Sequence, residues 1–166
     1  NGSRQHLKNE LEKIDLYTTD KKQIEFSEIV NLTNLGKNYD ISELVETCLI
    51  KNEKKVSKII NENNFSNEDA IIVIRTFLVK TKRLLHLSKN IKSNPDLESV
   101  ISSYRPAIFW KEKEVVKQQL KIWSEKSLSK LINEINDTEL LIKKNMSISL
   151  NILLNFIFSN SKITNS

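Results

Sequence analysis

The scarcity of glycine and proline constrains the fold of this chain more than any other feature. Only 2 Gly and 2 Pro occur among 166 residues. The tight turns of β-sandwiches, β-barrels and nucleotide-binding α/β sheets depend on these residues, so such folds are disfavoured. Gly2 and Gly36 are also too few to build a Gly-rich phosphate loop or a dinucleotide fingerprint. We therefore expect an all-α fold that does not hydrolyse nucleotides.

The composition is that of an ordinary globular protein, with 39% hydrophobic and 28% charged residues. No stretch approaches the roughly 20 continuous apolar residues that cross a bilayer. The single cysteine, Cys48, cannot form an internal disulfide, and no basic-then-apolar leader opens the sequence. These features predict a chain without membrane contact in a reducing, cytoplasmic location.

Apolar residues recur at helical spacing through most of the chain. Ser66 and Asp69 are expected to cap the longest helix, and a break is expected near Ser124. Asn145 is the expected left-handed stop before a last helix that is apolar nearly all round and should form the centre of the bundle. The predicted helices cover residues 3–17, 27–36, 41–50, about 56–60, 66–89, 97–104, 109–123, 125–145 and 147–158.

A polar segment at residues 37–40 is the best candidate for a domain boundary. It is expected to act as a hinge, because Asp40 followed by Glu43 resembles the capping box that starts a helix. We therefore predict a boundary near residue 38, with a helical domain over 38–160 and a frayed tail over 161–166.

The residue types that carry catalysis are sparse. His6 and His86 have no second ligand at a metal-binding spacing, and Cys48 lies in the apolar register of its helix, as a buried core thiol would. Two pairs of acids are spaced so that their side chains diverge on a helix, which indicates solvated surface: Glu10 with Glu12, and Glu112 with Glu114. No catalytic residue, metal or cofactor is expected.

One charge feature exceeds the background of a chain with net charge +5 and pI near 9.2. No acid occurs between Ala70 and Pro95, and four basic or imidazole side chains there share one helical face: Arg75, Lys82, His86 and Lys89. Such a stripe suits phosphates. It equally suits an exposed face that meets acidic protein or water.

A dense aromatic and basic segment, residues 104–113, follows this region. Aromatic rings beside cations can stack on unpaired bases, but aromatics at a helix start are often core anchors. We favour the core position for Phe109 and leave Trp110 open. The candidate DNA-contacting residues are Arg75, Lys82, Arg83, Lys89, Tyr104 and Trp110.

The order of several motifs resembles the carboxyl-terminal half of the bacterial DNA polymerase III delta subunits, the clamp-loader component often called the wrench. Residues 7–14 resemble a helix in the lid of the family's AAA+ module, and residues 41–46 resemble the start of its collar domain. Three further landmarks follow in the family's order, at residues 106–111, 119–124 and 138–144. Asn145 stands where the family closes a Lys-x-Gly motif.

The resemblance implies a division of the chain and a function. Residues 1–37 would be part of the AAA+ lid, and residues 38–160 the helical collar that assembles with the ATPase subunits and delta-prime. The loader places the sliding clamp on primed DNA during replication. Delta itself does not hydrolyse ATP, needs no cofactor, and is grouped with the nucleotidyltransferases only through membership of the polymerase holoenzyme.

The family grips the clamp through an amino-terminal module that nothing in this chain resembles, so the resemblance implies a fragment. The competing interpretation is a free-standing basic helical domain that binds nucleic acid, and an enzyme is a distant third. Salt dependence separates the first two, because a DNA-binding module should bind duplex alone and weaken steeply with salt.

Overall fold

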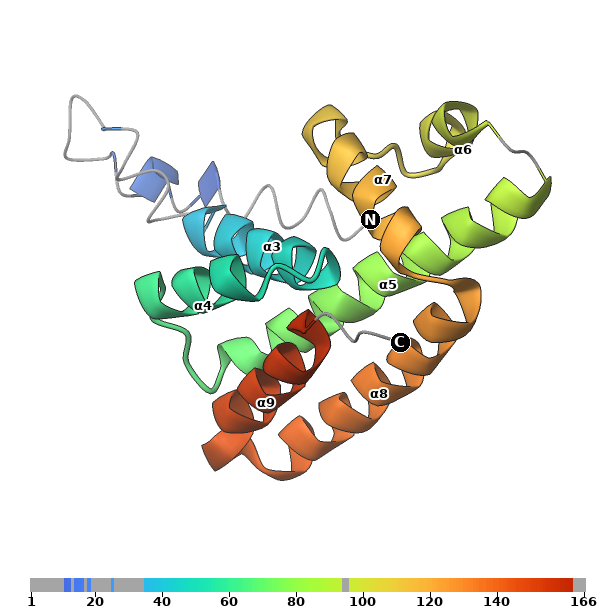
Figure 1. The fold of residues 1–166 in the computed structure, drawn as a ribbon. Coiled ribbons are helices and arrows are strands. Elements are labelled where there is room, and N and C mark those ends of the chain that lie inside the picture. The colour runs from blue at the N-terminus through green and yellow to red at the C-terminus, as the bar shows by residue number, and fades with distance from the viewer. Residues whose placement is uncertain are drawn as a thin grey trace. The chain divides into compact units, whose positions relative to one another are not determined.

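The computed structural model describes residues 11–12, 14–16, 18, 25, 35–93 and 96–162. These residues form α-helices and short 3₁₀ turns with no strand among them, which confirms the predicted all-α fold (Figure 1). The elements run in the order α3 (Leu35–Leu49), α4 (Glu53–Glu62), α5 (Asp69–Ser93), α6 (Leu97–Ser103), η1 (Trp110–Glu112), α7 (Lys113–Ile122), α8 (Glu125–Lys144), η2 (Met146–Ile148) and α9 (Ser149–Ser161).

Contacts divide the chain into two units, Asn1–Ile41 and Ser42–Ser166. In the first unit the described residues from Leu11 to Thr18 are helical, as the apolar spacing predicts, and the Thr18 hydroxyl donates to the Ile14 carbonyl over 3.0 Å. Most of the helix expected over 27–36 lies outside the described residues.

The predicted hinge at residues 37–40 is wrong, because α3 already begins at Leu35 and runs through it without a break. Asp40 therefore does not start the helix, and Gly36 does not end one. The polarity of this segment is compatible with helix, since polar side chains occupy exposed helix faces as readily as loops. The assignment of 1–37 to a lid and 38–160 to a collar stays a prediction.

The second unit is built around α5. This helix of 25 residues is about 37 Å long, and it contacts α6, α7, α8 and α9. Figure 1 shows α8 running alongside α5, with α9 next to both. The buried side chains of α5 include Val73, Ile74, Phe77, Leu84 and Leu87.

The last helix is largely covered, as its apolar composition predicts, but it shares the central place with α5. Of α9 only Asn151, Asn155 and Ser159 are exposed, whereas Leu153, Phe156 and Ile157 are buried. The Phe156 ring meets Phe77 of α5 edge to face at 5.3 Å, and α9 also contacts α4 and α8. The tail predicted over 161–166 is wrong at its first residue, because Ser161 still belongs to α9 and is buried, and residues 163–166 lie outside the described residues.

Local side-chain bonds start the helices where the sequence indicates. The Ser66 backbone N–H and hydroxyl both donate to Asp69 Oδ2 over 2.7 Å, which confirms the predicted cap of α5. The Ser124 hydroxyl oxygen accepts from the Ser127 N–H over 3.1 Å at the break before α8. Asn145, however, has φ −134° rather than a left-handed conformation, and its amide donates to the Leu141 carbonyl instead.

Candidate functional site

The exposed face of α5 carries the predicted basic residues together with two apolar ones. We name this set the α5 stripe: Ile72, Arg75, Val79, Lys82, His86 and Lys89. All six side chains are exposed, including 48% of Ile72 and 68% of Val79. The sequence spacing therefore locates the basic face correctly, but it overlooks the apolar members between the cations.

Carboxylates of α8 lie at both ends of the α5 stripe. Arg75 Nε donates to Glu139 Oε1 over 3.2 Å, and Lys92, one turn beyond Lys89, donates to Glu125 Oε2 over 2.5 Å. The bond from Lys92 and the charge of Lys89 lower the pKa of Glu125.

Glu139 is stabilised further by Lys143, whose hydrogen bond, together with that of Arg75, lowers the pKa of this carboxyl. Within the described part of the chain, no ion pair involves Lys82, at the middle of the stripe.

Arg83 lies off the α5 stripe in a buried charge cluster, which we define as Glu46, Lys80, Arg83 and Glu112. Arg83 Nη1 donates to Glu112 Oε2 over 2.8 Å, and Lys80 Nζ contacts Glu46 Oε1 and lies 3.9 Å from Glu112 Oε1. Only 9% of the Lys80 side chain and 15% of the Arg83 side chain are exposed. The cluster joins α3, α5 and η1, so the prediction of Glu112 as solvated surface is wrong.

The aromatic segment is exposed where we expected a core anchor. Phe109 is 56% exposed and Trp110 is 69% exposed, with ring centroids 5.8 Å apart and Lys111 Nζ 5.3 Å from the Trp110 ring. Ile108 supplies the buried side chain of this segment, so the core position predicted for Phe109 is wrong. Tyr104 is half-buried and meets the His86 ring at 5.6 Å, which places it beside the α5 stripe.

The sequence predicts a break between residues 50 and 56, where the structure has one, but it does not identify Lys51 as the residue that makes the turn between α3 and α4. Lys51 has φ 60°, in the left-handed region, although it is not a glycine. The Lys51 N–H donates to the Cys48 carbonyl over 2.9 Å and the Asn52 N–H to the Thr47 carbonyl over 3.2 Å, the paired bonds that close a helix carboxyl end. Only a glycine or asparagine would have signalled such a turn in advance.

The Lys51 side chain connects this turn to two other helices. Its Nζ donates to the Asn160 carbonyl of α9 over 2.5 Å and lies 4.1 Å from the Trp123 ring at the end of α7. Trp123 Nε1 in turn donates to the Leu49 carbonyl of α3 over 2.7 Å. Burial lowers the pKa of Lys51.

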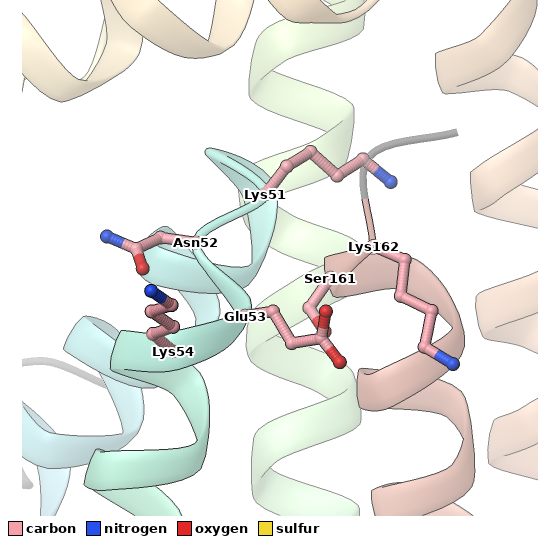
Figure 2. Close-up of a pocket in the computed structure, with 6 residues that line it drawn as sticks. All are labelled: Lys51, Asn52, Glu53, Lys54, Ser161 and Lys162. Carbon is pink, nitrogen blue, oxygen red and sulfur yellow. The ribbon is translucent and has the colours of Figure 1, made fainter. Parts of the chain in front are cut away.

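A pocket of about 570 Å³ lies between this turn and the end of α9. Figure 2 shows the amino groups of Lys51, Lys54 and Lys162 pointing away from one another, with the Glu53 carboxylate near Ser161. The cations therefore do not converge on a single point where an anion could be bound.

The residues considered for catalysis take structural positions. Burial raises the pKa of Cys48 to about 12, and its Sγ lies 3.5 Å from the Ile157 carbonyl oxygen, as expected of a core thiol. His86 Nε2 and the Asn90 amide are 3.0 Å apart. His6 lies outside the described residues, and among those described no group of three or more His, Cys, Asp or Glu could bind a metal.

The carboxyl end of α8 and the following η2 turn also expose apolar side chains. About half of each of four such side chains is exposed, and we name this set the α8 apolar end: Leu140, Leu141, Met146 and Ile148. Exposed apolar groups this close together along the chain favour a protein contact surface.

No single helix among those described is both long enough and apolar enough to cross a membrane. The pair formed by α8 and the η2–α9 segment meets both criteria together, but the two parts are bent by 113°. No family model, no curated protein and no solved structure matches the chain. The resemblance to the delta subunits therefore rests on the sequence motifs alone.

Proposed function

We propose that the chain is the collar-bearing part of a delta subunit of the bacterial replicative clamp loader, and that it serves assembly rather than catalysis. The observation that carries this proposal is the exposure of apolar side chains on a helical unit that already has a core of its own. The α8 apolar end and the apolar members of the α5 stripe are the main examples. Burying such groups against a neighbouring subunit is favourable.

The proposed division of labour follows the family that the motifs resemble. The collar joins the ATPase subunits and delta-prime, the neighbouring subunits hydrolyse ATP, and primed DNA is met only within the assembled loader. The sliding clamp is held by a module that no part of these 166 residues resembles. The chain itself has neither polymerase nor ATPase activity in this proposal.

Competition with full-length delta tests the proposal in a functional assay. Increasing amounts of the chain are added to a loader that contains full-length delta, and clamp loading on primed DNA is measured. The chain should replace delta in the ring and reduce loading, and excess full-length delta should restore it. Unchanged loading at a large excess of the chain would contradict the proposal.

A free-standing nucleic-acid-binding domain is the second candidate, favoured by the exposed Trp110 with Lys111 beside it. Titration of single-stranded and duplex oligonucleotides at several salt concentrations tests this candidate. Binding by the chain alone that weakens steeply with salt would support it. Lys82 is the residue to reverse in charge in this test, because Arg83 is engaged in the buried charge cluster.

A further inference from the structure

We propose that the α5 stripe is the docking surface for an amphipathic helix of a partner protein, one that carries acidic residues beside apolar ones. This inference rests on the proposed function, in which the partner is a neighbouring loader subunit. It chooses acidic protein for a face that the sequence pattern leaves open to phosphates, acidic protein or water.

The spacing of the α5 stripe suits a helix as the occupant. Ile72 and Val79 are seven residues apart, and Arg75, Lys82 and Lys89 follow one another at the same interval. A seven-residue repeat is the spacing that keeps two helices in continuous contact. The stripe extends over 18 residues, or about 27 Å of helix, so a partner helix of five turns would cover it.

The side chains of the stripe define the chemistry of the occupant. Val79 exposes 68% of its surface and Ile72 48%, so apolar partner residues are needed opposite them. Lys82 lies between these apolar positions and the far end of the stripe, and no carboxylate of the described residues pairs with it. An acidic partner side chain at that level would supply the missing charge.

The exposed apolar members of the stripe favour an amphipathic helix over nucleic acid on this face. Glu139 and Glu125 of α8, which border the stripe at its two ends, do not distinguish the two partners, because each is paired with a cation and would repel phosphates and partner carboxylates alike. The exposed apolar members would remain in water against a phosphate backbone, because base stacking requires aromatic rings rather than Ile72 and Val79. A helix with both apolar and acidic side chains would cover the apolar positions of the stripe and pair with its cations.

The test compares binding of purified ATPase subunits and delta-prime by the full chain and by four variants. Val79→Glu and Lys82→Glu alter the α5 stripe, and Ile122→Glu and Lys130→Glu are matched controls on α7 and α8. Ile122 is 45% exposed, and the Lys130 side chain is 80% exposed, so all four positions tolerate a charged residue without loss of the core. Circular dichroism confirms that each variant is folded.

The stripe variants should weaken subunit binding about tenfold or more, as loss of a central contact residue does, whereas the controls should bind like the unaltered chain. If the chain binds a subunit and the stripe variants bind it equally well, the inference is wrong and the proposed function stands. If the chain binds no subunit, the proposed function fails and the inference with it. If Lys82→Glu abolishes oligonucleotide binding but not subunit binding, the face belongs to nucleic acid and the inference is overturned.

Discussion

Lys51 combines an unfavourable backbone conformation with favourable side-chain contacts. Its left-handed backbone conformation is unfavourable for a residue with a Cβ atom by about 1–2 kcal/mol. Its side chain offsets this by donating to the Asn160 carbonyl and by lying 4.1 Å from the Trp123 ring. The turn between α3 and α4 is thereby fixed to the ends of α7 and α9.

Replacing Lys51 separates these two contributions. Lys51→Ala should lower the free energy of unfolding by about 2 kcal/mol, because the charged hydrogen bond and the cation–π contact are lost and the left-handed backbone remains. Lys51→Gly loses the same contacts but relieves the backbone, so it should be about 1 kcal/mol more stable than the alanine variant. Urea unfolding measures both values. Equal stability of the two variants would contradict the left-handed conformation.

Cys48 predicts a dependence of stability on pH. Burial raises its pKa from the usual value near 9.0 to about 12, so the folded chain keeps a proton that the unfolded chain loses. The contribution of this thiol to stability is therefore complete below pH 9 and falls as the pH rises from about 9 towards 12. Cys48→Ala should lose that slope; burial of Lys51 acts in the opposite sense, because the lowered pKa of this amine favours its neutral form.

Thiol reactivity gives an independent check on the same residue. At pH 8 the Cys48 thiol should react with an aromatic disulfide reagent far more slowly in the native chain than in urea. Rapid reaction of the native chain would show that the thiol is accessible, contrary to its burial.

At the scale of elements, the buried charge cluster joins three segments that are distant in the sequence. Glu46→Ala leaves the Lys80 ammonium with only the Glu112 carboxylate at 3.9 Å, so this variant should be destabilised by about 3 kcal/mol. The double variant Glu46→Leu/Lys80→Met removes both charges and should lose only about 1 kcal/mol. Urea unfolding of Glu46→Leu, Lys80→Met and the double variant measures the coupling. Additive losses would contradict the pairing.

The sequence predicts those elements whose signals are local. The predicted cap at Ser66 and the predicted break near Ser124 depend on residues three positions apart, and the apolar spacing of α4, α5 and α8 needs no knowledge of their neighbours. The exposed face of α5 follows from the same periodicity.

Features that depend on which helices meet are beyond such reasoning. Nothing near Arg83 in the sequence indicates that its guanidinium forms a half-buried ion pair with Glu112, 29 residues later. Phe109 has the large apolar side chain typical of a core residue, yet the neighbouring Ile108 is the residue that is buried. The left-handed turn at Lys51 could not be predicted for a related reason. Lysine does not itself favour this backbone conformation, and the contacts with Trp123 and Asn160 that stabilise it come from distant parts of the sequence.

At the scale of the whole molecule, α5 has two roles. Its inner face contacts four other helices of the second unit, and its outer face carries the α5 stripe. A partner bound to the stripe would therefore rest on the helix that organises the core. In the proposed loader, this arrangement would give the collar a rigid surface for its neighbour without any need to rearrange the bundle.

Direct binding of loader subunits is the measurement that tests the central claim. The chain is mixed in turn with the purified ATPase subunit, delta-prime and the sliding clamp, and each mixture is analysed by size-exclusion chromatography with light scattering. The chain should co-elute with the ATPase subunit or delta-prime and elute separately from the clamp. Co-elution with the clamp, or separate elution from every loader subunit, would contradict the claim.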